Sequence, residues 1–122
     1  MSPTLNTIII YAKDMQKTAG FYSRFFGFET TGQVVEGLIE LTSSTGTSIL
    51  VHQAAKSVKL GQVGVKLVFS VRDIEDFKSR SSKRGLAFGS THHANGYSFA
   101  NAKDPDKNTV SISSRAFRQV TD

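Results

Sequence analysis

Two short segments of this sequence repeat one pattern, and that repeat limits the folds the chain can adopt. Segment 11–15 reads Tyr-Ala-Lys-Asp-Met and segment 70–74 reads Ser-Val-Arg-Asp-Ile, so their aspartates lie 59 residues apart. Gly27 and Gly85 follow those aspartates by 13 and 12 residues. A repeat on this scale indicates one supersecondary unit used twice, each half being too small to bury its own sheet face.

The first half of the chain predicts a strand, a helix and three further strands. Residues 6–13 contain three consecutive isoleucines and predict a central strand that is buried on both faces. Asp14 is a typical N-cap, and apolar residues at 15, 19, 22 and 26 mark one face of a helix that ends at Gly27. Turn-forming residues then separate expected strands over 28–35, 38–42 and 47–53.

The second half predicts the same order of elements. A strand is expected over 64–71, after which Asp73 caps a helix that Gly85 ends. Further strands are expected over 86–91, 97–102 and 108–114, with Asn95-Gly96 as a hairpin turn. Residues 54–62 are small, polar and lysine-bearing, and they are the predicted linker between the two halves.

Composition narrows the class of protein. The 122 residues are 39% hydrophobic and 20% charged, as expected for one compact soluble domain. The absence of cysteine excludes disulfides, thiolate metal sites and cysteine nucleophiles. No apolar run approaches the roughly 18 residues that span a bilayer. Because the N-terminus also lacks a signal-peptide pattern, we expect a cytoplasmic protein with no membrane partner.

Charge narrows the class of partner. A net charge of +5 and a pI near 9.7 would suit nucleic acid, an anionic membrane surface or an acidic small molecule. The fifteen Lys and Arg residues are scattered along the chain, and no helix-turn-helix or RNA-stacking pattern is present. A small-molecule ligand is therefore expected in preference to nucleic acid.

Segment 104–113 joins a turn to the last predicted strand. Asp104-Pro105-Asp106 has turn chemistry, because proline presets φ and aspartate bonds the local backbone. Val110 and Ile112 then alternate with hydroxyl residues, which predicts a strand with one apolar face and one hydroxyl face. If the hydroxyl face lines a cavity, Ser111 points into it, and serine is a poor ligand for common metals.

These landmarks together resemble the vicinal oxygen chelate superfamily, which includes glyoxalases, bleomycin resistance proteins, extradiol dioxygenases and fosfomycin resistance proteins. The resemblance rests on the duplicated β-α-β-β-β order, segment 11–15, Phe21-Tyr22, Gly27-Phe28, and Asp-Pro-Asp-Lys-Asn at 104–108. It covers nearly the whole chain. It implies a single α+β domain, 1–122, in which two tandem units, about 5–53 and 63–114, form curved mixed sheets around a pocket.

Metal-dependent members of that superfamily carry His, Gln or Glu ligands on the first and last strands of each unit. The landmarks place Thr7, Leu50, Lys66 and Ser111 at those positions. None of these is a strong ligand for a divalent metal, and a lysine ammonium would repel a cation. We therefore expect no metal and no other cofactor.

Two residues carry the candidate chemistry. Lys66 could anchor a carboxylate or phosphate, or its stem could cross the sheet edge and place the ammonium in water. His52 shares strand parity with Leu50, so it could face the pocket for hydrogen bonding or proton transfer, or be a strand-end histidine in water. His92 and His93 are adjacent, would face opposite sides of a strand, and are interpreted mainly as loop residues.

Tyr11, Tyr97 and Phe99 could form aromatic walls of the pocket, with ordinary core packing as the alternative. The complete set of expected ligand-binding residues is Thr7, Tyr11, Leu50, His52, Lys66, Tyr97, Phe99 and Ser111.

The sequence thus predicts a glyoxalase/bleomycin-resistance-like protein that binds a small neutral or anionic molecule without a metal. Binders of cationic drugs would be expected to be acidic, which disfavours a cationic ligand here. A homodimer is implied by the resemblance alone. One alternative is a metal-dependent glyoxalase-type lyase or dioxygenase with atypical ligands, with His52 among them, and another is a non-catalytic interaction module.

Overall fold

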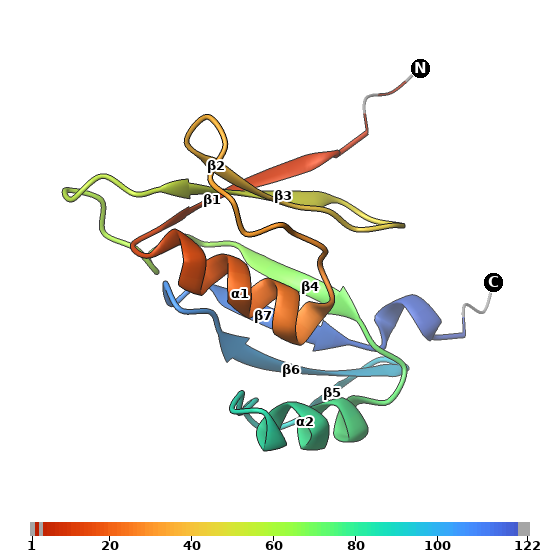
Figure 1. The fold of residues 1–122 in the computed structure, drawn as a ribbon. Helices are drawn as coiled ribbons and strands as arrows, with labels where there is room; N and C mark the ends of the chain where they lie inside the picture. The colour runs from red at the N-terminus through yellow and green to blue at the C-terminus, as the bar shows by residue number, and fades with distance from the viewer. Residues whose placement is uncertain (1, 3, 120–122) are drawn as a thin grey trace. The chain divides into compact units, whose positions relative to one another are not determined.

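Two units make up the chain, and the boundary lies between Gln62 and Val63. The computed structural model describes residues 2 and 4–119. Each unit contains one long helix and one mixed sheet, as Figure 1 shows. The boundary falls at the end of the predicted linker. The assignment of both units to one domain stays a prediction.

Unit 1 contains β1 (Thr7–Ala12), α1 (Met15–Phe26), β2 (Leu38–Leu41) and β3 (Ser48–Gln53). The strand order is β1-β3-β2, with β3 parallel to β1 and antiparallel to β2. Helix α1 packs against all three strands. β1 and β3 are therefore neighbours in the sheet, although they are far apart in the sequence.

Helix α1 begins and ends where the sequence predicts. The Asp14 side chain accepts a hydrogen bond from the Lys17 backbone N–H at 3.1 Å, which satisfies one of the unpaired donors of the first turn. Gly27 has φ +73°, a left-handed conformation that glycine adopts without strain, and ends the helix. Ala19 and Tyr22 are buried, as the amphipathic spacing predicts.

The sheet of unit 1 has two different faces. The apolar side chains of Ala12, Ile39, Leu41, Ile49 and Val51 share one face and are buried. The other face, here called the helix-free face of unit 1, carries side chains from Thr7, Ile9, Tyr11, Leu38, Glu40, Ser48, Leu50 and His52. Residue alternation along each strand therefore separates core positions from candidate binding positions.

The prediction that β1 is a central strand buried on both faces is wrong. Among the described residues, β1 pairs only with β3, and it lies at the edge of its sheet. Ile9 and Tyr11 are each 50% exposed. A run of consecutive isoleucines cannot distinguish a strand with two buried faces from an edge strand, because both satisfy the same local pattern.

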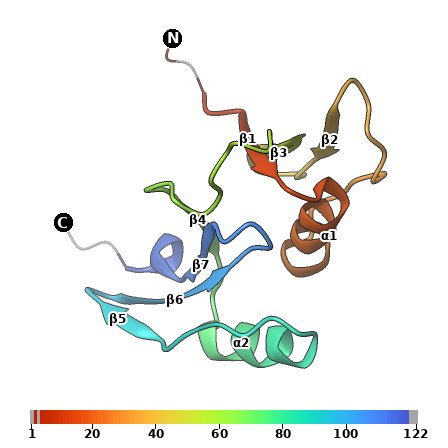
Figure 2. The same ribbon diagram turned by 90° about the vertical axis from the view of Figure 1, so that its left-hand side faces the viewer.

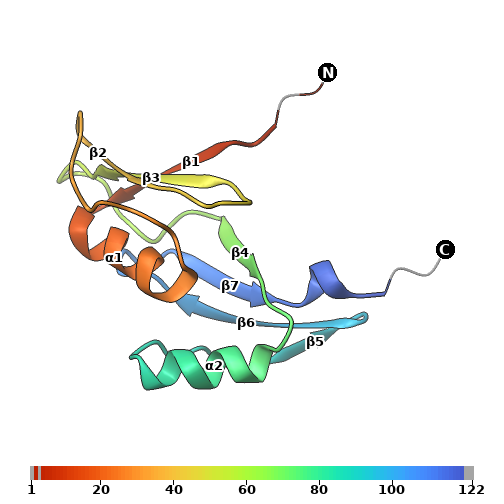
Figure 3. The ribbon, with the colours of Figure 1, turned by 45° about the vertical axis from the view of Figure 1, so that its right-hand side comes forward.

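Unit 2 contains β4 (Lys66–Ser70), α2 (Ile74–Lys83), β5 (His92–Ala94), β6 (Tyr97–Lys103) and β7 (Thr109–Ser113). A single helical turn, η1 (Arg115–Phe117), follows β7. The strand order is β4-β7-β6-β5, with β4 parallel to β7 and the other pairs antiparallel. Helix α2 runs beside β6 (Figure 2, Figure 3).

Unit 2 repeats the caps and the core pattern of unit 1. The Asp73 side chain accepts a hydrogen bond from the Asp76 backbone N–H at 3.0 Å, and Gly85, at φ +99°, follows the end of α2. The buried apolar side chains of this unit are Ile74, Leu86, Ala100, Ala102, Val110 and Ile112. The α+β class with two repeated units is confirmed.

The strand predicted over 28–35 is reduced to two isolated bridges, Glu29 with Thr42 and Val35 with Leu38. Between them, the hydroxyls of Thr30 and Thr31 accept hydrogen bonds from backbone N–H groups two residues further on. Such local bonds compete with sheet pairing, so the intervening chain leaves the ladder.

The strand predicted over 86–91 is also absent. Leu86 donates its backbone N–H to the Ser81 carbonyl at 2.9 Å, which ties this segment to the end of α2. The second strand of the unit, β5, instead contains His92 and His93, so their interpretation as loop residues is wrong. Asn95-Gly96 forms the two-residue loop between β5 and β6, as predicted.

A helix that crosses a bilayer must be both long and apolar. Within residues 2 and 4–119, no helix has the length and hydropathy that crossing a bilayer requires.

The turn before β7 is held by Asp104, which is 4% exposed. Its Oδ1 accepts hydrogen bonds from the backbone N–H groups of Asp106, at 2.8 Å, and Asn108, at 2.9 Å. Its Oδ2 accepts a third bond from the Asn108 side chain at 3.0 Å. This arrangement puts Lys107 at φ +68°, a conformation that residues with a Cβ disfavour.

We expect Lys107→Gly to raise the free energy of unfolding by about 0.5 to 1 kcal/mol, because relief of left-handed strain outweighs the added freedom of the unfolded chain. Lys107→Ala is the matched control, since it removes the same charge and keeps the strain. Urea denaturation of the three proteins checks this. A glycine variant no more stable than the alanine variant would contradict it.

Candidate functional site

The candidate site of unit 2 is the face of its sheet opposite the buried apolar side chains. Strand register and alternation place the following residues there: Lys66, Val68 and Ser70 of β4, Thr109, Ser111 and Ser113 of β7, Tyr97, Phe99, Asn101 and Lys103 of β6, and His92 of β5. We call this the helix-free face of unit 2. It contains all four binding residues predicted in the second half of the chain.

Lys66 reaches across the sheet from its edge. Its Nζ donates a hydrogen bond to Asn101 Oδ1 at 3.2 Å, although β7 lies between β4 and β6. The same Nζ lies 5.2 Å from the centre of the Phe99 ring, within the range of a cation–π contact. The ammonium is therefore held over the sheet face, next to an aromatic ring.

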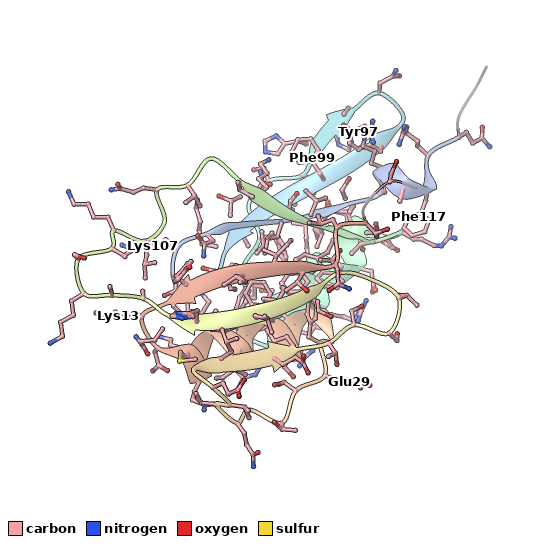
Figure 4. All side chains as sticks on the ribbon, turned by 90° about the horizontal axis from the view of Figure 1, so that it is seen from above. Lys13, Glu29, Tyr97, Phe99, Lys107 and Phe117 are labelled. Atoms are coloured by element: carbon pink, nitrogen blue, oxygen red, sulfur yellow. The ribbon has the colours of Figure 1, made fainter. Side chains whose placement is uncertain are left out.

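Aromatic rings continue along this face. The Phe99 ring centre lies 5.1 Å from that of His92 and 6.4 Å from that of Tyr97. The Arg115 guanidinium carbon lies 5.8 Å from the centre of the Tyr97 ring. Tyr97 and Phe99, labelled in Figure 4, are half-buried and lie away from the apolar core of the unit. Of these three rings, Phe99 in the middle contacts Lys66 and Tyr97 at one end contacts Arg115.

Positive charge dominates the helix-free face of unit 2. Lys103 also lies there and donates to Thr109 Oγ1 at 2.7 Å. The strand residues of this face include no Asp or Glu. The corresponding face of unit 1 differs, because it carries Glu40 and no Lys or Arg on its strands. An anionic group would thus interact favourably with the unit 2 face.

Ser111 has a structural partner. It is 2% exposed, and its hydroxyl donates to the Ala100 carbonyl at 3.1 Å across the β6–β7 pair. Its neighbour Ser113 accepts a hydrogen bond from the Arg115 N–H at 3.1 Å. The hydroxyl proton of Ser111 is committed to the sheet, so only acceptor capacity remains for a ligand.

The four binding residues predicted in the first half all lie on the helix-free face of unit 1. Tyr11 and His52 are opposite each other on β1 and β3, and their ring centres are 5.2 Å apart. His52 Nδ1 lies 2.8 Å from the Gln53 carbonyl oxygen. Because a carbonyl can only accept, Nδ1 carries the proton, and Nε2 is the nitrogen left for another partner.

Thr7 and Leu50 complete this group and offer less chemistry. The Thr7 hydroxyl donates to Asn6 Oδ1 at 2.6 Å, and Leu50 is half-buried. The structure thus brings the predicted residues together in two sets, one in each unit. Their roles in binding remain predictions.

Sequence reasoning missed three residues that contact the predicted ones. Asn101 orients Lys66, His92 stacks on Phe99, and Arg115 stacks on Tyr97. Asn101 shares parity with Phe99, a signal that could have placed it on the correct face. His92 and Arg115 gave no such signal, because the ends of β5 and η1 were not predicted.

The residues at the expected metal positions do not fit a divalent ion. Lys66 brings a positive charge, Leu50 has no donor atom, and the Ser111 hydroxyl bonds the backbone. Across residues 2 and 4–119, no three His, Asp or Glu side chains gather closely enough to hold a metal. This donor set differs from the carboxylate and imidazole groups that bind divalent ions.

Comparison with known proteins identifies one family model. The model described as Glyoxalase/Bleomycin resistance protein/Dioxygenase superfamily matches residues 4–112. No protein of curated function shows significant sequence similarity to the chain.

Several solved structures share the fold. UcmS2 is 16% identical over 93% of this chain and 99% of that chain, with a TM-score of 0.77. TnmS3, an antibiotic binding protein from Streptomyces sp. CB03234, is 18% identical over 91% and 94%, with a TM-score of 0.74. A lactoylglutathione lyase from Agrobacterium tumefaciens is 20% identical over 92% and 93%, with a TM-score of 0.71. At these identities the likeness concerns the fold.

We expect Ser111→Ala to lower the free energy of unfolding by about 1 kcal/mol, because it removes a buried hydroxyl that is hydrogen-bonded to the backbone. Ser48→Ala is the control, since Ser48 lies on the helix-free face of unit 1 and its hydroxyl makes no hydrogen bond with the described residues. Chemical denaturation measures both changes. Equal stability of the two variants would show that the Ser111 hydroxyl is not committed to the sheet.

Proposed function

Because the chain belongs to the Glyoxalase/Bleomycin resistance protein/Dioxygenase superfamily, we propose that it binds a small neutral or anionic molecule without the help of a metal. Structures with this fold include an antibiotic binding protein and a lyase, so the fold alone is compatible with binding and with catalysis. The observation that carries the proposal is the position of the Lys66 ammonium over the helix-free face of unit 2.

Lys66 is well placed to hold an anionic group. An ammonium has three donors, and only one is used by Asn101. The Phe99 ring beside it gives an aromatic surface on which a planar ligand can stack. A charge-assisted hydrogen bond from the remaining donors to a carboxylate or phosphate would fix the ligand's orientation.

The charge of the chain supports the same class of ligand. Lys103 adds a second cation to the helix-free face of unit 2, and the net charge of the chain is +5. A cationic ligand would be repelled by this field, whereas an anion would be attracted.

Independence from metal is proposed from the chemistry of the side chains present. Thr7, Leu50, Lys66 and Ser111 replace the His, Gln or Glu ligands that metal-dependent members of the superfamily carry. In unit 1, His52 Nε2 and the Tyr11 ring are proposed as polar and aromatic ligand contacts. From the family alone we also propose that the protein is a homodimer.

We expect Lys66→Met to weaken binding of 1-naphthoate, a planar aromatic anion, at least tenfold. Methionine keeps most of the apolar stem and removes the charge, and the loss of one charge-assisted hydrogen bond is worth about 1.5 to 3 kcal/mol. Isothermal titration calorimetry measures the change. Lys59→Met, in the exposed linker, is the control and should bind as the parent protein does.

The neutral analogue 1-naphthamide separates charge from stacking. Its affinity should be similar for the parent protein and for Lys66→Met, because only the anion uses the ammonium. If Lys66→Met binds 1-naphthoate as tightly as the parent protein does, Lys66 is not the anchor. If neither probe binds the parent protein, this ligand class is wrong and the non-catalytic interaction module gains support.

We expect protein purified without chelator to contain less than stoichiometric metal, and Ni²⁺, Zn²⁺, Fe²⁺ or Mn²⁺ to leave the melting temperature unchanged, because a metal that binds only the native state would raise it. Elemental analysis and thermal-shift measurements check this. One equivalent of metal that is lost on His52→Ala would instead support the metal-dependent lyase or dioxygenase.

A further inference from the structure

Unit 2 contains an open groove of about 370 Å³ that shares none of the predicted binding residues. It lies at the junction of β4 and α2, and its lining includes Arg72, Glu75, His93, Ser98 and Ser114. His93 follows His92, and Ser98 precedes Phe99. Because His92 and Phe99 lie on the helix-free face, His93 and Ser98 lie on the opposite face of the sheet. The groove is therefore distinct from the site proposed above.

The carboxylates of the groove already have partners. Asp73 accepts a hydrogen bond from the Asp76 N–H and caps α2. Glu75 accepts a short hydrogen bond from the Thr91 hydroxyl, which in turn accepts one from Lys78 Nζ at 2.9 Å. The Glu75 contact ties α2 to the segment before β5, whereas the Asp73 contact caps the helix.

The side-chain N–H groups of Arg72 are the hydrogen-bond donors of the groove that are available to a ligand. The Arg72 guanidinium carbon lies 4.0 Å from the centre of the Phe117 ring (Phe117 is labelled in Figure 4). Within residues 2 and 4–119, Arg72 makes no ion pair and no hydrogen bond through its side chain. Stacking through its flat surface leaves the N–H groups at its rim directed outward in the plane.

His93 provides a second possible contact. Its Nδ1 lies 2.9 Å from Ser98 Oγ, so Nε2 is the ring nitrogen left for a ligand. Ser98 is fixed in turn, because its backbone N–H donates to Ser114 Oγ at 3.0 Å. The histidine ring is thus held in place by a serine that is itself anchored to the chain after β7.

We propose that this groove is a second ligand site, which takes a small molecule carrying a phosphate or carboxylate group. The Arg72 guanidinium binds the oxyanion through two parallel N–H bonds, and the Phe117 ring keeps the guanidinium in position. His93 Nε2 contacts the same ligand. The volume lies within the range of 300 to 1,000 Å³ that is usual for small-molecule sites.

The test uses the full-length chain with phenyl phosphate as the probe, followed by amide chemical shifts in NMR titrations. Shifts are expected for the amides of Arg72, Glu75, His93 and Ser98. Arg72→Gln should weaken binding at least tenfold. The affinity of Arg72→Lys should lie between those of the parent protein and Arg72→Gln, because lysine keeps the positive charge but cannot donate two parallel N–H bonds. Arg24→Gln, an equal charge change at the exposed end of α1, should have no effect.

Lys66→Met distinguishes this site from the one on the helix-free face. Binding of phenyl phosphate in the groove should survive that substitution unchanged. The proposal is overturned if phenyl phosphate does not bind, if the shifts are confined to residues around Lys66, or if Arg72→Gln binds as tightly as Arg24→Gln. Retained amide dispersion in each variant confirms that the fold is intact.

Discussion

The pairing of β7 with β4 on one side and β6 on the other is the interaction on which unit 2 depends. Val110 and Ile112 are fully buried and supply the apolar centre of the sheet. The same pairing brings Lys66 of one neighbouring strand within hydrogen-bonding distance of Asn101 of the other. A single central strand therefore fixes both the core of the unit and the position of its candidate anchor.

Local sequence signals predicted the elements whose ends are set by local chemistry. Asp14 and Asp73 each bond a backbone N–H three residues later, so both helix starts could be read directly. The strands expected after the two helices were not found, because a strand-like pattern does not show whether local hydrogen bonds will replace sheet pairing. Leu86 bonds the Ser81 carbonyl at the end of α2, and the Thr30 hydroxyl accepts a bond from the Gly32 N–H.

The candidate site was predictable in part for the same reason. Parity along β6 was enough to place Tyr97 and Phe99 on one face, whereas Lys66 and Ser111, which lie on different strands, were grouped by the family resemblance. Parity gives no information about which strand lies next to which. The contacts of Lys66 with Asn101, and of Arg115 with Tyr97, depend on sheet order and on η1, which only the structure supplies.

The hairpin of β5 and β6 limits which sequence changes the chain can accept. Its two-residue loop, Asn95-Gly96, fixes the register of β5 against β6. His92 therefore lies opposite Phe99 and stacks on it, while His93 lies opposite Ser98 on the other face and bonds it. Insertion of one residue in the strand would exchange the two histidines between the faces. Substitutions can therefore change the contacts on one face without those on the other, whereas the length of this hairpin must stay constant for either set of contacts to persist.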